Sequence, residues 1–417
     1  MIQTTTLENG LRLVTEDTAD FQSVALSFWV GTGSRDEKEG ERGMSHFLEH
    51  LLFKGSEQRS AFEIAEAIDG VGGDMNAFTT KECTAFYVRV LSEDCELALD
   101  ILCDIMSAPA LDPTETEAER QVVLEEILMR GDDPADLAHD YLSQAMFAGH
   151  SLGYEILGDA DDVGAIASAD LRRFFDHHYR PGNLVFAAAG DVRHDWLATQ
   201  VERRFRDRTG GQRPGRVSPM LRTGETYVYK RPSDQAHLVI GVPGPNRHDP
   251  DRYAASLLDT ILGGGMSSRL FQEVREKRGL AYTVYSSFAA YEDAGEFSVY
   301  IGTGPKRVHE AIDVVNQQLQ AVKSDGVTEA ELQRAKRHSR ATIALGLEDS
   351  SARMSRIGRS LLLHGDVLSI DEINGRVEAV TRDDVSRVAQ RLFAVDPTIV
   401  GVGPLRQDLS PVARKAS

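Results

Sequence analysis

The chain repeats part of its own sequence at a distance of 212 residues, and this repeat limits the folds that are open to it. The segment Thr116–Glu119 (TEAE) recurs as Thr328–Glu331, and Arg35 stands 212 positions before Arg247 in a similar context. Two anchors with one offset predict a duplicated domain of about 200 residues, which is a common domain size. Chance similarity is the alternative, because TEAE is also a frequent capping-box start of helices.

A segment that is poor in apolar residues separates the two copies. Residues 208–216 (RTGGQRPGR) have the composition of a linker, so we expect one domain over residues 1–215 and a homologous domain over residues 216–417. Strand-like stretches such as Val24–Val30 mix with helical patterns along the chain. This mixture predicts an α+β fold in which helices cover a sheet. We expect residues 406–417 to form an unstructured tail.

The composition argues against several classes of protein. The chain has 46 basic and 65 acidic side chains, a formal charge of −19, which disfavours binding to nucleic acid or to an anionic membrane. No apolar run approaches the roughly 18 residues of a membrane span. Three cysteines without a CxxC spacing, and a start without a signal peptide, predict the cytoplasm. Surplus acid favours a cationic partner, although it also simply keeps proteins soluble.

The most informative motif is His46-Phe47-Leu48-Glu49-His50. On a helix, His46, Glu49 and His50 project from one face. Two neutral imidazoles at this spacing can share one zinc ion, and the carboxylate beside them can activate a water molecule for amide hydrolysis. We expect Ser45 to be the N-cap of this helix. The alternative is an accidental histidine pair on an ordinary helix.

A zinc ion with two histidines needs a third ligand, and a second predicted helix supplies candidates. This helix runs from Pro113 to Arg130, and Glu119 and Glu126 lie within about 20° of each other around it. Taken alone, such glutamates usually belong to a solvated face. Beside a histidine pair that lacks a ligand, a functional role is favoured. The apolar residues of the same stripe, which we expect to face inward, are Val122, Val123 and Ile127.

The HxxEH motif, followed by a glutamate 76 residues after His50, resembles the inverzincin peptidases of the pitrilysin, insulin-degrading enzyme and mitochondrial processing peptidase family. The resemblance implies two repeated α+β domains, each with a mostly antiparallel sheet covered by helices. It also implies that His46, His50 and Glu126 bind zinc and that Glu49 is the general base. Glu119 would be the carboxylate that orients a ligand histidine.

The second copy lacks this ligand set, so we expect one Zn2+ per chain. At the offset of 212, apolar residues replace His46, Glu49 and His50, and a histidine replaces Glu126. The four replacements are Leu258, Ile261, Leu262 and His338.

Two further motifs match the family. Asn76 and Ala77 resemble its edge strand, which pairs with extended substrate, although a turn that enters a strand is the alternative. Arg275 and Tyr282 match an Arg/Tyr pair that the family presents to the zinc site. Tyr282 would then donate to the oxyanion and Arg275 would hold the substrate. A surface arginine and a core tyrosine are the alternative. The glycine-rich stretch 263–268 lacks a GxxxxGK[ST] pattern, so we expect no nucleotide site there.

These features predict a zinc-dependent endopeptidase that acts on extended peptides, basic ones in particular. The resemblance implies a closed chamber of four such domains. This chain supplies two domains and carries both the zinc motif and the Arg/Tyr pair, so we expect a homodimer. The alternatives are a presequence-specific processing peptidase and a non-catalytic structural or peptide-binding subunit.

Overall fold

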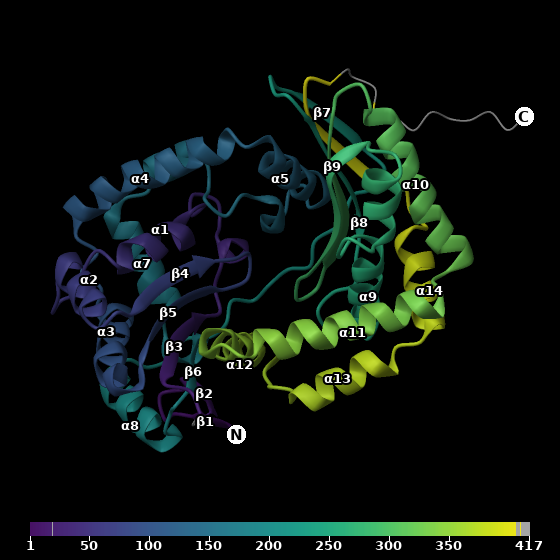
Figure 1. The fold of residues 1–417 in the computed structure, drawn as a ribbon. Helices are drawn as coiled ribbons and strands as arrows, with labels where there is room; N and C mark the ends of the chain where they lie inside the picture. Colours follow the sequence, from purple (N-terminus) through teal and green to yellow (C-terminus); the bar gives the residue numbers. More distant parts are fainter. Residues whose placement is uncertain (19, 406–408, 410–417) are drawn as a thin grey trace, which may run out of the picture. The chain divides into compact units, whose positions relative to one another are not determined.

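The computed structural model describes residues 1–18, 20–405 and 409. Apart from Leu409, the predicted tail over residues 406–417 lies outside the described residues. The chain forms two compact units (Figure 1), each assembled from three segments. The first unit contains Met1–Leu128, Tyr154–Arg216 and Ile343–Leu368, and the second contains Met129–Gly153, Val217–Thr342 and Ser369–Ser417.

The first unit is built on a six-stranded sheet with the order β1-β2-β6-β3-β5-β4. Strands β2 and β6 are parallel, and the other neighbouring pairs are antiparallel. The strands are β1 (Ile2–Thr6), β2 (Arg12–Asp17), β3 (Ser23–Val30), β4 (Asp74–Thr79), β5 (Thr84–Leu91) and β6 (Leu184–Gly190).

Helices cover this sheet because its strands are apolar on both faces. In β3, Leu26 and Phe28 face the larger core, whereas Ala25 and Trp29 face a second core on the opposite side. The helices that build the first unit around the larger core are α1 (Met44–Leu52), α2 (Ala61–Gly70), α3 (Cys95–Ser107), α4 (Pro113–Gly131), α7 (Ser168–His178) and α8 (His194–Phe205).

The second unit repeats this topology. Its five-stranded sheet has the order β7-β11-β8-β10-β9, and β7 and β11 form the parallel pair. Strands β2, β6, β3, β5 and β4 of the first unit follow the same order, so the predicted α+β fold with two repeated domains is confirmed. The strands are β7 (Thr226–Lys230), β8 (Ala236–Pro243), β9 (Ala281–Ala290), β10 (Gly295–Thr303) and β11 (Thr398–Gly403), and the main helices are α9 (Arg252–Leu262), α10 (Val308–Asp325), α11 (Glu329–Gly346), α13 (Ile370–Ala379) and α14 (Arg382–Leu392).

The two halves of the chain exchange one helix. Helix α5 (Pro134–Met146), from the first half, packs on β8 and β11 of the second unit through residues such as Leu142. Its repeat equivalent α12 (Ser350–His364) packs on β2, β3 and β6 of the first unit, where Ile357 joins the core around Trp29. The compact units therefore differ from residues 1–215 and 216–417 by these exchanged segments.

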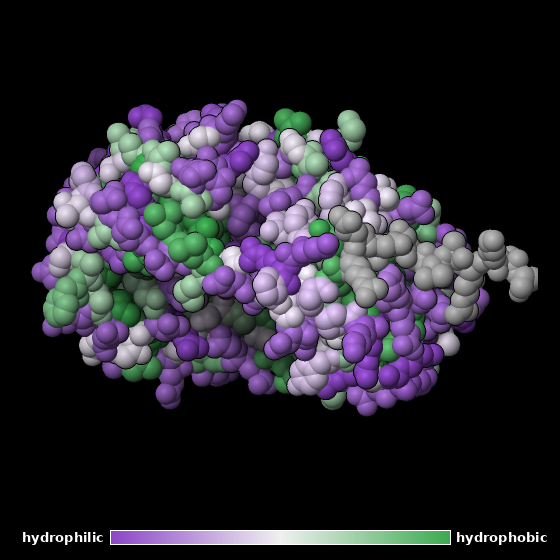
Figure 2. Space-filling view, turned by 90° about the horizontal axis from the view of Figure 1, so that it is seen from above, coloured by the Kyte–Doolittle hydropathy of each residue, from purple (hydrophilic) through white to green (hydrophobic). Residues whose placement is uncertain are grey.

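The face of the molecule drawn in Figure 2 is mostly polar. Hydrophilic residues dominate it, with smaller groups of hydrophobic residues between them. Among the described residues, no helix is long and apolar enough to cross a membrane.

Candidate metal centre

Helix α1, which carries the HxxEH motif, is capped by a carboxylate from the loop that precedes it. It begins at Met44 after Gly43, whose φ of 87° suits glycine, so the prediction that Ser45 is the N-cap was wrong. Instead, the N–H groups of Gly43 and Ser45 donate to the two carboxylate oxygens of Glu37, at 2.9 and 2.8 Å. Burial raises the pKa of Glu37 to about 8, although both hydrogen bonds oppose this rise. The cap fixes the start of the helix just before His46.

Three side chains from α1 and α4 converge in the first unit. The Nε2 atoms of His46 and His50 lie 3.3 Å apart, and Glu126 Oε2 lies 3.5 Å from each of them. Helix α1 holds the two histidines in place because its opposite face is buried in the core through Leu48 and Leu52. Glu126 is 44% exposed, so one side of the cluster is open to solvent.

This arrangement fits a tetrahedral zinc ion. Ligand atoms about 2.0–2.1 Å from a tetrahedral zinc lie about 3.3–3.4 Å from one another. The separations of 3.3 and 3.5 Å in the cluster match this value. Burial and the neighbouring His50 lower the pKa of His46 to about 4, so that this imidazole is neutral and able to bind a metal.

Glu119 holds His50 in the orientation that a ligand requires. Its Oε1 lies 2.8 Å from His50 Nδ1, which favours a proton on Nδ1 and leaves the Nε2 lone pair facing His46 and Glu126. Lys54 Nζ lies 2.6 Å from the other carboxylate oxygen. Burial alone would raise the pKa of Glu119, but the hydrogen bonds from Lys54 and His50 outweigh it and lower the pKa. Glu119 is therefore an ionised, paired carboxylate.

Glu49 lies on the same face of α1 and is held by a strand. Thr79, the last residue of β4, donates its hydroxyl to Glu49 Oε2 at 2.6 Å. Burial raises the pKa of Glu49, and the hydrogen bond from Thr79 opposes this shift. A carboxylate with a raised pKa is suited to accept and later return a proton. The sequence signalled neither Thr79 nor Lys54, because each acts through a contact made only in the folded chain.

Strand β4, with Asn76 and Ala77, is at the edge of the first sheet. Asn76 and Ala77 pair with Tyr87 and Phe86 of β5, and no other described strand pairs with β4. An open edge of this kind can accept an extended peptide as an added strand. The turn that was the alternative for these two residues is not observed.

The stripe on α4 is only partly inward-facing. Val123 is buried in the core and Glu119 is nearly so, but Val122 is 49% exposed, so its predicted inward orientation was wrong. Val122 lies about 60° around the helix from Glu119, on the side away from Val123. That angle is enough to bring it to the solvent.

Arg275 and Tyr282 are neighbours in the second unit. Arg275 is part of a π-helical segment, Phe271–Glu276, and its guanidinium carbon lies 4.8 Å from the ring centroid of Tyr282 on β9. Tyr282 is 73% exposed, which excludes the alternative of a core tyrosine. Leu258, Ile261 and Leu262 are buried apolar residues of α9. In the described part of the chain, the metal-ligating cluster that forms is the one in the first unit.

A duplicated α+β fold with an HxxEH helix in one repeat defines a class of metallopeptidases. Residues 12–160 match the family model described as Insulinase (Peptidase family M16), and residues 165–338 match the Peptidase M16 inactive domain. The chain is 43% identical to an uncharacterized zinc protease of Streptomyces coelicolor, over 97% of this chain and 90% of that protein. It is 40% identical to the uncharacterized zinc protease YmxG of Bacillus subtilis, over 97% and 98% of the two chains.

The chain therefore belongs to the pitrilysin or M16 family of zinc metallopeptidases. A solved structure of a protease from Helicobacter pylori has the same fold, with a TM-score of 0.90 at 24% sequence identity over 97% of this chain and 99% of that one. The "inactive domain" model falls mainly on the repeat that lacks the ligand set.

Proposed function

We propose that this protein is a zinc-dependent endopeptidase with one Zn2+ per chain, bound by His46, His50 and Glu126. The observation that carries the proposal is the spacing of 3.3–3.5 Å among these three ligand atoms, with the Glu49 carboxylate on the same helix face. The M16 family and the names of the relatives support a peptidase.

Several residues of the chain have separate roles in the proposed peptide hydrolysis. Zinc, when bound, would polarise a water molecule and the scissile carbonyl. Glu49, held by Thr79, takes the proton from the attacking water and passes it to the leaving amine. Glu119 keeps His50 in its ligand orientation. By family resemblance, Tyr282 would donate a hydrogen bond to the developing oxyanion and Arg275 would hold the substrate.

We propose that the substrate is an extended peptide that pairs with β4 at Asn76 and Ala77. Pairing through the backbone requires little of the peptide sequence. The formal charge of −19 favours basic peptides, because opposite charge speeds encounter.

The test is turnover of an internally quenched basic peptide by the purified chain. We expect hydrolysis that a chelator abolishes and one equivalent of zinc restores, with slower cleavage of an acidic peptide of equal length. Equal rates on the two peptides would overturn the charge preference. Bound zinc without turnover of any peptide would instead support a non-catalytic subunit. Cleavage of a folded precursor but not of free peptides would support a processing peptidase.

We also propose a homodimer in which Arg275 and Tyr282 act on the zinc site of the partner subunit. The support is that one chain carries both the zinc motif and the Arg/Tyr pair. Mixing two inactive variants, Glu49→Gln and Tyr282→Phe, tests this arrangement. Half of the randomly mixed dimers would contain one intact site, so about a quarter of wild-type activity should return. If Tyr282 served the zinc of its own chain, mixing would restore nothing.

A further inference from the structure

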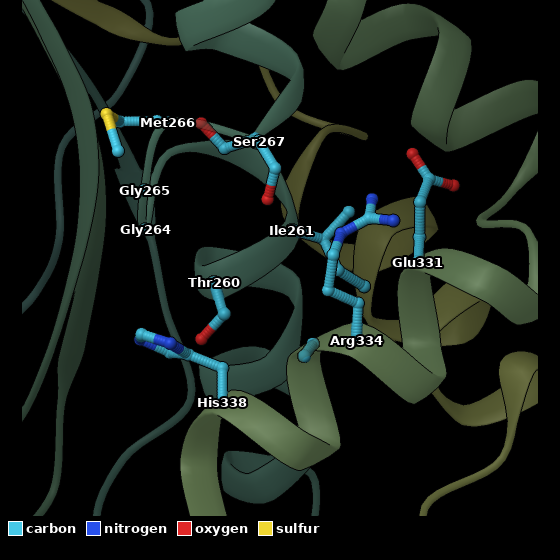
Figure 3. Close-up of a pocket in the computed structure, with 11 residues that line it drawn as sticks. Thr260, Ile261, Gly264, Gly265, Met266, Ser267, Glu331, Arg334 and His338 are labelled. Atoms are coloured by element: carbon cyan, nitrogen blue, oxygen red, sulfur yellow. The ribbon is translucent and has the colours of Figure 1, made fainter. Parts of the chain in front are cut away.

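The second unit contains a cavity at the position that corresponds, by the repeat, to the metal centre. The cavity has a volume of about 300 Å³ and lies between the end of α9, the following glycine-rich loop and α11 (Figure 3). At the offset of 212, its residues Ile261, Glu331 and His338 correspond to Glu49, Glu119 and Glu126. Apolar residues of α9 occupy the positions that correspond to the histidine pair. Helix α11 lines the cavity with charged and polar side chains that differ from those of the metal centre.

The charge of this cavity is positive. Arg334 and His338 of α11 line it, and neither side chain has an ion pair or hydrogen-bond partner among the described residues. Figure 3 shows Arg334 extending from α11 towards the loop that carries Ser267. The one acidic residue of the lining, Glu331, is already paired, since Arg269 lies 2.7 and 2.9 Å from its two oxygens. Arg334 is therefore an uncompensated cation in a concave site.

The glycine-rich loop packs closely against α9 and β9 and leaves its tip exposed beside the cavity. A Cβ atom on Gly263 would overlap the backbone of Ser286, and one on Gly264 would lie 2.7 Å from Thr260 Cα, so close packing requires these two glycines. Gly265 has open space around its Cβ position. Gly265 and Ser267 are exposed residues, and their amides have no backbone hydrogen-bond partner in the described part of the chain. They add unpaired donors beside the Ser267 hydroxyl.

We propose that this cavity is a binding site for a small oxyanion, a carboxylate or phosphate group carried by a small molecule. The planar guanidinium of Arg334 can donate two parallel hydrogen bonds to such a group, and His338 and Ser267 can add further donors. Ile261, Met266 and Ala335 make part of the lining apolar and leave room for a short apolar substituent. The proposal does not depend on the peptidase activity.

Calorimetric titration of the full-length protein tests the proposal. Inorganic phosphate is titrated in one arm and N-acetylalanine in another, with N-acetylalaninamide as the uncharged control, all at one ionic strength. We expect saturable binding of at least one anion and a loss of affinity of about tenfold or more in Arg334→Gln. Arg337→Gln is the matched control, because Arg337 is exposed on the same helix but does not line the cavity. Its affinity should stay within about twofold of wild type.

Comparing the two titrations shows which anionic group the cavity prefers. Tighter binding of inorganic phosphate indicates a phosphate ligand, and tighter binding of N-acetylalanine indicates a carboxylate ligand. Absence of saturable binding of either anion would overturn the proposal. An equal loss of anion affinity in Arg334→Gln and Arg337→Gln would also overturn the proposal. Such a result would show that anions are attracted to the general charge of α11 and not to a defined site. Binding that survives Arg334→Gln but disappears on chelation would belong to the metal centre instead.

Discussion

Replacing Glu49 by glutamine should reduce peptide hydrolysis by about 10²-fold or more while the chain still binds zinc. The amide has the size of the carboxylate and can still meet the Thr79 hydroxyl, so the packing of α1 is kept. It cannot accept a proton from water, and a positioned general base contributes about 10²–10⁴-fold to the rate. Rates on the quenched peptide and zinc content by mass spectrometry, measured on the same preparation, give the result.

Glu125→Gln is the control for this experiment. Glu125 is an exposed residue of α4 next to Glu126, and its replacement makes the same chemical change outside the cluster. It should keep full activity. Equal activity of wild type and Glu49→Gln would mean that a contaminant or another site cleaves the peptide. If neither wild type nor Glu49→Gln hydrolyses the peptide although zinc is bound, the result would point to a missing partner chain or to a peptide-binding scaffold.

Replacing Gly358 by alanine should destabilise the first unit by about 2 kcal/mol or more, the range expected for overpacking a core. Gly358 lies in α12, where the helix meets β3 and β6. An added Cβ would lie 2.7 Å from Trp29 Cδ1, closer still to Trp29 Nε1, and 2.9 Å from Ala187 Cβ. The indole is buried and donates to Ser27 Oγ at 2.8 Å, so it cannot move aside without losing this bond.

Intrinsic fluorescence measures this effect selectively. The chain has two tryptophans, Trp29 and Trp196, and both lie in the first unit, so denaturant unfolding followed by fluorescence reports on that unit. Gly164→Ala is the control, because Gly164 is an exposed residue of helix α6 (Ala160–Ala165) in the same unit, with nothing within 4 Å of its Cβ position. There the same change should raise helix stability by up to about 1 kcal/mol. A neutral or stabilising Gly358→Ala would show that α12 does not pack tightly on the first sheet.

Much of the candidate site could be predicted from the sequence because it depends on helical geometry. The four-residue spacing of His46 and His50, and the seven-residue spacing of Glu119 and Glu126, place each pair on one helix face whatever the rest of the chain does. The structure places Glu119 beside His50 and Glu126 beside both histidines. The repeat could also be detected in the sequence, because two copies of one fold keep corresponding helices and strands at a nearly constant distance along the chain.

The supporting contacts of the site could not be predicted in this way. Glu37 caps α1, Lys54 pairs with Glu119, and Thr79 donates to Glu49. Each of these contacts joins a loop or a strand end to a helix. No periodic pattern relates the two partners, so their distance is set only when the sheet and the helices pack.

The sequence by itself determined the α+β class, the duplication and the face of α1 that carries His46, Glu49 and His50. Only the tertiary structure decided which sheet each helix covers. Helices α5 and α12 occupy equivalent places in the two repeats, and each packs on the sheet of the other half. An amphipathic stripe specifies that a helix must be buried, but not against which of two similar apolar sheet faces. That choice depends on fitted contacts such as Gly358 against Trp29, which exist only in the folded chain.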